Sequence, residues 1–236
     1  KMSTRLVIVS DSHNKHNELI LPQGTILIHC GDGTYHGEVA ETINWLVWLQ
    51  LQTHKYQAVL SIFGNHEIYV SQNVDEFREL RSIYAPDVKW LTMNSWKDPV
   101  SGLKFYGCPY VNFINGRWAW EATESEMEEL VKRIPNDIDV LISHGPPYGI
   151  LDNFYRKRAI DDPTARFGIR FEEIELKVGS KALLKRIQEI RPSVVCFGHI
   201  HENGNTKLEI DGITYINAAI LDEHYEIAHE PMVIDV

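Results

Sequence analysis

The chain of 236 residues has few cysteines and no long hydrophobic run. Its three cysteines, Cys30, Cys108 and Cys196, are odd in number, and two of them lie inside apolar, strand-like stretches. This favours buried, reduced thiols in a cytoplasmic protein over a disulfide framework, and no cysteine has the spacing of a thiolate metal site. No apolar stretch approaches the roughly 20 residues that a membrane helix needs, and no signal-peptide pattern opens the sequence. We therefore expect no membrane partner.

An excess of basic residues is also missing. The formal net charge is −10, which argues against a role as a nucleic-acid scaffold, because such proteins usually present a basic face. An anionic substrate is still allowed, since bound metal ions reverse the charge locally. Linkers, low-complexity tracts and internal repeats are absent as well, so we expect one domain over residues 2–236.

Strand-like and helix-like patterns alternate along the chain. The strand-like patterns occur at residues 5–10, 25–30, 58–63, 139–143, 194–197, 207–210, 213–216 and 232–236. Helices are expected over residues 38–52, from a capping box at Thr123 to Pro135, and from Ser180 to Pro192. The pair Asp211-Gly212 predicts a hairpin. This alternation predicts an α/β (α+β) protein with two sheets and helices outside them.

Five short motifs, each after an expected strand, carry side chains that can bind metal ions. They are Ser-Asp-Ser-His at 10–13, Gly-Asp at 31–32, Gly-Asn-His-Glu at 64–67, Ser-His-Gly-Pro-Pro at 143–147 and Gly-His-Ile-His at 198–201. The candidate ligands are Asp11, His13, Asp32, Asn65, His144, His199 and His201. A single Asp-x-His or Gly-Asp can merely shape a turn. The ordered set of five is improbable by chance, and it predicts two metal ions held against a phosphate ester.

The residue types limit the metals and the chemistry. Carboxylate, amide and imidazole ligands without thiolate suit manganese, iron or zinc. Two such ions about 3.5–4 Å apart can deprotonate a shared water and clamp the phosphate oxygens during in-line displacement. Asp32 is able to bridge because a carboxylate has two oxygens, whereas Asn65 offers a neutral carbonyl. The six histidines outside the set are expected to be structural or solvated: His16, His29, His36, His54, His224 and His229.

Over residues 11–201 the motif order resembles that of the calcineurin-like metallophosphoesterase superfamily. Residues 27–32, 144–152, 197–202 and 215–218 are similar to the small metallophosphoesterase domain-containing proteins, whose known members hydrolyse phosphodiesters, including cyclic nucleotides. The resemblance implies a four-layer α/β/β/α sandwich of two mixed sheets flanked by helices. It also implies a ligand assignment, with Asp11, His13 and His201 on one metal ion, Asn65, His144 and His199 on the other, and Asp32 bridging both.

The motif at 64–67 adds two residues beyond the ligands. By the same resemblance His66 faces the leaving-group oxygen, and an imidazole can donate the proton that a departing alkoxide needs. His66 and Asp32 are therefore the expected catalytic residues. For Glu67 two interpretations stay open: it orients His66 and holds the loop, or it caps a following helix.

Two parts of the sequence depart from relatives. Residues 31–37 lack the G-D-x-V-D-R-G motif of the serine/threonine protein phosphatases, and those enzymes lack the closing Gly-His-x-His, so protein dephosphorylation is not expected. Residues 153–179 mix arginines with aromatics, which fits a substrate lid, an oligomer contact or a solvated loop. A second aromatic cluster, Tyr110, Phe113, Trp118 and Trp120, either lines a nucleoside pocket or packs over a sheet.

The expected function is that of a cytoplasmic phosphodiesterase with two divalent metal ions, manganese foremost and iron or zinc as alternatives. Its expected partner is a small nucleotide-like phosphate ester. A phosphomonoesterase shares the same motifs and is the alternative within enzymes. A non-catalytic scaffold is the rival outside enzymes, but such a protein usually loses ligands or the catalytic histidine, and this chain keeps all seven ligands and His66. The sequence leaves the oligomeric state open.

Overall fold

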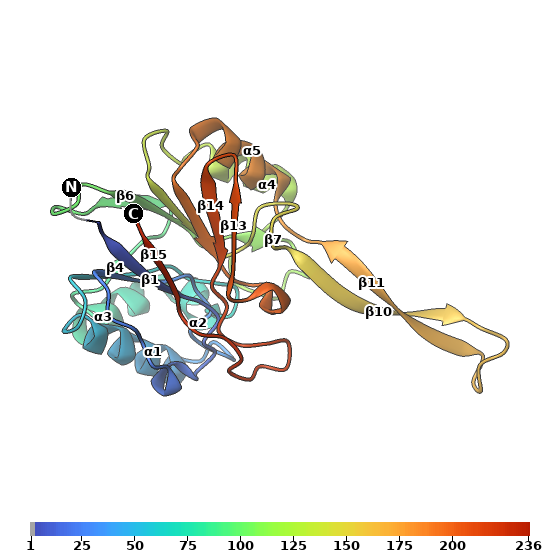
Figure 1. Cartoon of the computed structure of the whole chain (residues 1–236). Coiled ribbons are helices and arrows are strands. Elements are labelled where there is room, and N and C mark those ends of the chain that lie inside the picture. Colours follow the sequence, from blue (N-terminus) through green and yellow to red (C-terminus); the bar gives the residue numbers. More distant parts are fainter. Residues whose placement is uncertain (1–2) are drawn as a thin grey trace.

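Two stacked β-sheets carry helices on their outer faces (Figure 1). The structure is a computed structural model that describes residues 3–236, so the expected domain boundary at residue 2 lies outside the described part. The first sheet has the order β15-β1-β2-β3-β4. Its strands are β15 (Met232–Asp235), β1 (Arg5–Val9), β2 (Ile26–His29), β3 (Ala58–Ser61) and β4 (Lys89–Trp90). All neighbours in this sheet are parallel except the β15–β1 pair.

The second sheet has the order β13-β14-β12-β9-β6-β5. Its strands are β13 (Thr206–Ile210), β14 (Ile213–Asn217), β12 (Val194–Phe197), β9 (Val140–Ser143), β6 (Lys104–Cys108) and β5 (Asn94–Lys97). The four central strands are parallel, and β13 and β5 add antiparallel edges. The expected hairpin joins β13 to β14, and both turn residues, Asp211 and Gly212, have the positive φ that a two-residue hairpin turn requires.

The helices cover the two outer faces. The first sheet carries α1 (Val39–Gln52), α2 (Ile68–Gln72) and α3 (Val74–Tyr84), and the second carries α4 (Glu124–Val131) and α5 (Lys181–Ile190). The Thr123 hydroxyl accepts a hydrogen bond from the Glu126 amide, and Ser180 caps α5 in the same way through Leu183. The α4 helix ends at Val131, before the expected limit at Pro135. The prediction of a four-layer sandwich is confirmed.

Three apolar layers explain why the strands are nearly continuous apolar runs. In β1, Leu6 and Ile8 face the second sheet, while Val7 and Val9 face α1 and its neighbours. Both faces are therefore buried, as in sheets that are covered on each side. Each such side chain stabilises the fold by about 1.5–3 kcal/mol relative to an exposed one.

Several elements were not expected from sequence. The short elements β4, β5 and α2 carry too few residues to show a clear period. The α3 helix does carry apolar residues at helical spacing, Val74, Phe77, Leu80 and Tyr84, and this pattern was overlooked. Residues 153–179 contain a β-hairpin, β10 (Asn153–Asp161) and β11 (Ile169–Lys177), which extends away from the rest of the molecule (Figure 1). In a single copy this hairpin therefore leaves the edge with the five motifs uncovered, which disfavours the lid interpretation.

The aromatic cluster of Tyr110, Phe113, Trp118 and Trp120 was expected either to line a pocket or to pack over a sheet, and its members differ in this respect. It lies beside the short strands β7 (Val111–Asn112) and β8 (Glu121–Ala122). Trp120 packs against Phe63, with ring centroids 5.6 Å apart, and Tyr110 packs edge-on against Trp120. Phe113 is exposed. Trp118 turns towards the five motifs, where its ring packs against that of His66.

The structure also bears on the expectations drawn from composition. All three cysteines are buried free thiols, as predicted. Among the described residues, no helix has the length and apolar character needed to cross a membrane.

Candidate metal centre

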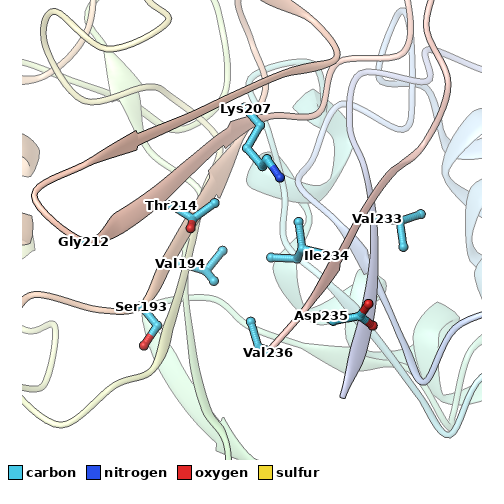
Figure 2. A pocket seen from close by; sticks show the side chains of 9 residues that line it. All are labelled: Ser193, Val194, Lys207, Gly212, Thr214, Val233, Ile234, Asp235 and Val236. Atoms are coloured by element: carbon cyan, nitrogen blue, oxygen red, sulfur yellow. The ribbon is translucent and has the colours of Figure 1, made fainter. Parts of the chain in front are cut away.

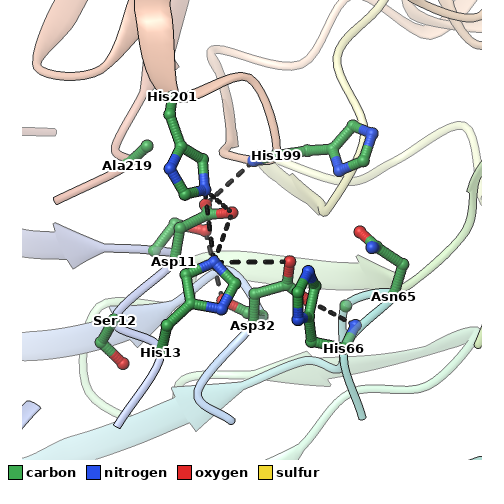
Figure 3. A network of polar contacts seen from close by, with 12 residues as sticks. Asp11, Ser12, His13, Asp32, Asn65, His66, His199, His201 and Ala219 are labelled. Carbon is green, nitrogen blue, oxygen red and sulfur yellow. Dashed lines mark hydrogen bonds and ion pairs between the residues drawn. The ribbon is translucent and has the colours of Figure 1, made fainter. Parts of the chain in front are cut away.

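The five motifs meet where parallel strands of the two sheets end. The loops after β1, β2 and β3 come from the first sheet, and those after β9 and β12 come from the second. Figure 3 labels candidate ligands from all of these loops except the one after β9. Hydrogen bonds tie the loops together, from the Asp11 amide to the Gly31 carbonyl and from the Gly198 amide to the His144 carbonyl. The carboxyl ends of parallel strands are the usual place for ligand sites, because their connecting loops gather there.

Several candidate ligands have strained backbone conformations. Four of the seven have left-handed backbone, namely Asp11 (φ 54°), His13 (φ 36°), Asp32 (φ 56°) and His199 (φ 68°). Such conformations cost about 1–3 kcal/mol each and persist where the surrounding structure enforces them. Concentration of strain in these loops is typical of a functional site.

Two motif glycines are required by close approach. A Cβ at Gly198 would lie 1.9 Å from Asp11 Oδ2, and a Cβ at Gly64 would lie 2.3 Å from Asp32 Oδ1. No side chain fits at either position without displacing a candidate ligand. Steric exclusion therefore explains why Gly-His-Ile-His and Gly-Asn-His-Glu each begin with glycine.

The first group of candidate ligands is Asp11, His13 and His201, whose ligand atoms all lie within 4.8 Å of one another. The Nδ1–H groups of His13 and His201 donate to the carbonyls of Thr34 and Asp222, at 2.9 and 2.8 Å. Both Nε2 atoms are thus turned towards each other, 3.2 Å apart. Asp11 Oδ1 is buried without a hydrogen-bond partner and lies 3.3 Å from His201 Nε2. Three buried lone pairs that converge in this way fit a cation.

The second group is Asp32, His144 and His199, joined by Asn65. His144 donates its Nδ1–H to the Cys30 carbonyl at 2.7 Å, which leaves Nε2 to face the group. This Nε2 lies 3.1 Å from both Asp32 Oδ2 and Asn65 Oδ1. His199 is half-buried, and its ring centroid is 5.2 Å from that of His144.

Asp32 lies between the groups. Its Oδ2 is 3.9 Å from His13 Nε2 and 3.1 Å from His144 Nε2. Its Oδ1 accepts a hydrogen bond from the His66 amide at 2.8 Å. One oxygen, Oδ2, therefore faces both groups, while Oδ1 is bonded to the His66 amide. The expectation from sequence had relied instead on the two oxygens of the carboxylate.

The electrostatics show how the site is balanced without a cation. Burial by itself would lower the pKa of His144, but the charge of Asp32 and the hydrogen bond to it raise this pKa to about 10. Likewise burial would lower the pKa of His201, whereas the Asp11 carboxylate, 3.3 Å away, raises it to about 9. Burial lowers the pKa of His13 to about 4. The buried carboxylates therefore favour a positive charge at this place, and metal ions held by the same atoms would compete with protons for it.

Glu67 holds the loops in place. Its carboxylate oxygens accept hydrogen bonds from the amides of Asp32, Thr34 and Gly64 and from the Thr34 hydroxyl. Burial, and then the charge of Asp32, raises the pKa of Glu67 to about 8, against the opposing effect of these amides. Its side chain makes no capping bond to α2. Of the two interpretations left open by sequence, the loop-holding role fits the structure.

His66 borders the centre together with an aromatic rim. It donates Nδ1–H to the Tyr35 carbonyl at 2.5 Å, and its ring centroid lies 4.5 Å from that of His13 and 4.5 Å from that of Trp118. Tyr225 completes the rim, with its ring centroid 5.0 Å from that of His13. We define the rim as Tyr35, Trp118 and Tyr225.

Sequence reasoning missed Tyr35 and Tyr225. Tyr225 lies in the irregular segment before β15, where no motif or spacing marks it. Burial, followed by the charges of Asp32 and Asp11, raises the pKa of Tyr225 to about 12, so its hydroxyl remains a hydrogen-bond donor. Tyr35 lies within the Gly31–Gly37 segment, where only Asp32 was singled out.

A hollow also lies away from the five motifs. A cavity of about 460 Å³ occupies the other end of β12, near Val194, next to β15 (Figure 2). Among its described lining residues, Asp235 has the one carboxylate side chain, which is paired with Arg5 at 2.9 Å, and Lys207 has the one basic side chain. The same described residues include no histidine, cysteine or glutamate, so they offer no comparable chemistry.

A model of the calcineurin-like phosphoesterase family matches residues 4–203, which span all five motifs. The chain belongs to the calcineurin-like phosphoesterase family. It is 29% identical to human metallophosphoesterase domain-containing protein 1, over 99% of this chain and 71% of that protein. It is also 29% identical to UPF0046 protein K07C11.7 of Caenorhabditis elegans, over 97% of this chain and 74% of that protein.

Solved structures show the same fold at low identity. The protein TT1561 of Thermus thermophilus aligns with a TM-score of 0.61 and 9% identity, over 92% of this chain and 89% of that chain. Phosphopantetheinyl hydrolase from Mycobacterium tuberculosis aligns with a TM-score of 0.58 and 12% identity, over 94% and 91%. The expected superfamily and its small metallophosphoesterase branch are confirmed by the family match and the relatives.

As a calcineurin-like phosphoesterase, the chain is a hydrolase of phosphoric esters, and its histidine and aspartate clusters suit divalent metal ions. The structure brings together all seven candidate ligands, with His66 beside them. Their individual roles stay predictions. Tyr225 lies beyond the family match, which is a second reason why sequence motifs do not find it.

Proposed function

We propose that this calcineurin-like phosphoesterase is a cytoplasmic, single-domain phosphodiesterase that hydrolyses small nucleotide-like diesters with two divalent metal ions. The observation that carries the proposal is Asp32 Oδ2, which faces both ligand groups while His66 and the aromatic rim border them. Manganese is the expected metal, with iron or zinc as alternatives, because oxygen and imidazole donors surround both positions.

Each ligand group would hold one ion. Asp11, His13 and His201 form the first position, Asn65, His144 and His199 form the second, and Asp32 contributes to both. When bound, the ions supply a water that is deprotonated at neutral pH and a positive clamp for the phosphate oxygens. The Nδ1–H bonds of His13 and His201 to backbone carbonyls orient the rings so that each Nε2 is free to ligate.

His66 would protonate the leaving-group oxygen. Its Nδ1–H bond to the Tyr35 carbonyl fixes the ring, and its Nε2 makes no hydrogen bond to another described residue. When His66 carries a proton on both ring nitrogens, the one on Nε2 can pass to the leaving oxygen of the substrate while Nδ1–H keeps its bond to Tyr35. Asp32 Oδ1 supports this position by accepting the His66 amide hydrogen.

The surroundings favour a diester over a monoester. Within residues 3–236, the hydrogen bonds and ion pairs of the seven candidate ligands involve no lysine or arginine. A monoester carries more negative charge, which basic side chains would help to bind. A diester carries one charge and a second organic group, and the rim of Tyr35, Trp118 and Tyr225 offers that group apolar contact.

The test compares kcat/KM for bis(p-nitrophenyl) phosphate and p-nitrophenyl phosphate on one metal-loaded preparation. We expect the diester to be preferred by about tenfold or more, which corresponds to about 1.4 kcal/mol in the barrier. Trp118→Ala should raise KM for the diester more than for the monoester. Phe113→Ala, an exposed aromatic of the same segment, is the matched control. A tenfold preference for the monoester would favour the phosphomonoesterase alternative, and absence of both activities after metal loading would contradict the phosphoesterase assignment.

A further inference from the structure

The β10–β11 hairpin, which we call the arm (residues 153–177), is unlike the rest of the molecule. Nine cross-strand pairs run from Asn153 and Lys177 at its root to Asp161 and Ile169 near its tip. Every residue of both strands is exposed or half-exposed, and Figure 1 shows the arm extending away from the sheets. An isolated two-stranded sheet is marginally stable in water, because neither face is covered.

The root of the arm is firmly anchored. Asp152 Oδ2 accepts hydrogen bonds from the amides of Gly149 and Gly179, both at 2.9 Å. Asn153 and Asn203 exchange two hydrogen bonds, at 3.1 and 3.4 Å. These bonds set the direction in which the arm leaves the body, so binding a partner through it costs little ordering of the root.

Apolar side chains are exposed along the arm. They are Phe154 (39%), Tyr155 (43%), Phe167 (82%), Ile169 (49%), Phe171 (67%) and Leu176 (37%). Single exposed apolar residues are ordinary, but a concentration of aromatic ones on a projecting hairpin marks an interaction surface.

The charge distribution indicates which partner fits. The arm carries six basic and five acidic side chains, a net charge of +1, so the remainder of the chain carries −11. Arg158 and Arg170 pair with Glu172 and Asp162 within the arm. Arg156, Lys157 and Arg166 form no ion pair with another described residue, and they are attracted to an acidic surface like that of the body of this same chain. An anionic membrane would attract these three residues but repel the body.

The dimensions also fit a second copy. Strands of nine residues extend about 30 Å, and a body of about 200 residues has a radius of gyration of about 16 Å. The arm is thus long enough to lie across a neighbouring body. It offers about 25 residues, which matches the roughly 20–30 residues per side of a stable interface.

We propose that the arm clasps the body of a second copy of this chain, and that two arms exchanged in this way form a two-fold symmetric dimer. The contact is the same on both copies, as in most homodimers. Aromatic residues of the arm supply apolar contact, and its basic residues face the acidic body of the partner. This inference does not depend on the proposed phosphodiesterase activity.

The experiment measures molar mass by sedimentation for the full chain and for a variant with a shortened arm. Replacing residues 155–175 by Asn-Gly keeps the root pair of Phe154 and Leu176 and closes it with a two-residue turn. At about 10 μM, a concentration that reports micromolar affinities, we expect the full chain to be a dimer and the shortened chain a monomer. Equal metal content and thermal unfolding would show that the shortened chain is folded.

A second pair of variants separates specific contact from net charge. The arm variant reverses Arg156, Lys157 and Arg166, and the matched control reverses Lys55, Lys89 and Lys185, all exposed residues without an ion pair among those described. Each variant replaces the three residues by glutamate. We expect the arm variant to raise the dimer Kd by about tenfold or more, and the control by about twofold or less.

Four outcomes would overturn the proposal. They are a full chain that stays monomeric, a dimer that survives shortening of the arm, equal weakening by the two charge variants, and a monomer that binds vesicles containing phosphatidylserine through the arm. The last would assign the arm to a membrane surface instead. The dimer proposal is supported if shortening the arm abolishes the dimer and if, of the two charge variants, only the arm variant weakens it.

Discussion

The metal centre and the arm both combine charged and aromatic side chains, but they are built in opposite ways. The candidate ligands come from five loops far apart in sequence, and nearly all of them are buried. The arm is one continuous segment, and its side chains face water. Buried polar atoms each need a partner, so the loops that carry them are held by dense hydrogen bonding, as Glu67 shows. Exposed polar atoms are satisfied by water and tolerate substitution.

This comparison predicts that loss of one carboxylate in the metal centre has a far larger effect than loss of most of the arm. Asp32→Ala should reduce kcat/KM by more than about 100-fold, because Asp32 Oδ2 faces both groups. Residues that only support ligands typically contribute about 10–100-fold. The metal content measured by mass spectrometry should fall at both positions. The arm-shortened variant is the control, and its kcat/KM for a small diester should change by about twofold or less.

An Asp32→Ala protein that kept two metal ions per chain and ordinary turnover would show that Asp32 is not shared. A large loss of activity on shortening the arm, with metal content unchanged, would break the comparison from the other side, because it would place part of the arm in the catalytic machinery.

The next effect tests His66 through the leaving group. His66→Ala should slow nucleotide diesters by about 10²–10⁴-fold, because a ribose alkoxide needs a proton to depart. Nitrophenyl esters should lose much less, since nitrophenolate leaves without protonation. His54→Ala, which removes an exposed histidine, should leave both rates unchanged. Equal losses for both leaving groups, together with loss of metal, would instead mean that His66 only supports its loop.

The smallest effect concerns acid stability. Burial lowers the pKa of His16 to about 4, from an ordinary value of 6.5. The folded state therefore binds fewer protons, so the stability from keeping His16 neutral is fully present above pH 6.5 and is lost as the pH falls towards 4. When the pH is lowered from about 7.5 to about 5, the unfolding free energy of the metal-free parent should fall by about 2 kcal/mol more than that of metal-free His16→Phe.

Urea unfolding at the two pH values measures this difference. The arm-shortened variant should keep the pH dependence of the parent, because the arm holds no buried histidine. Identical pH dependence in the parent and His16→Phe would show that His16 is not a buried neutral group.

Local patterns in the sequence were sufficient for much of the fold. The strands at residues 5–10, 25–30 and 194–197 and the capped helices after Thr123 and Ser180 are confirmed, because apolar period and capping depend on neighbouring residues. The short strands β4 and β5 and the helices α2 and α3 were not found. The elements β4, β5 and α2 are too short to carry a period of their own and follow from packing on the sheets. The α3 helix has an apolar face that was overlooked.

The candidate site also has features that follow from the sequence and features that only the tertiary structure shows. By itself the sequence determined the family, the five motifs and the seven residues that the fold brings together, because each motif follows a strand and parallel strands end at one edge. Only the tertiary structure decided that Asp32 Oδ2 faces both groups, that Glu67 ties the loops and that Tyr225 completes the rim. It also decided that residues 153–177 form a projecting arm. The features of the site depend on distances between segments remote in sequence, which no local pattern encodes. The direction of the arm depends on its root, where Asn153 bonds to Asn203.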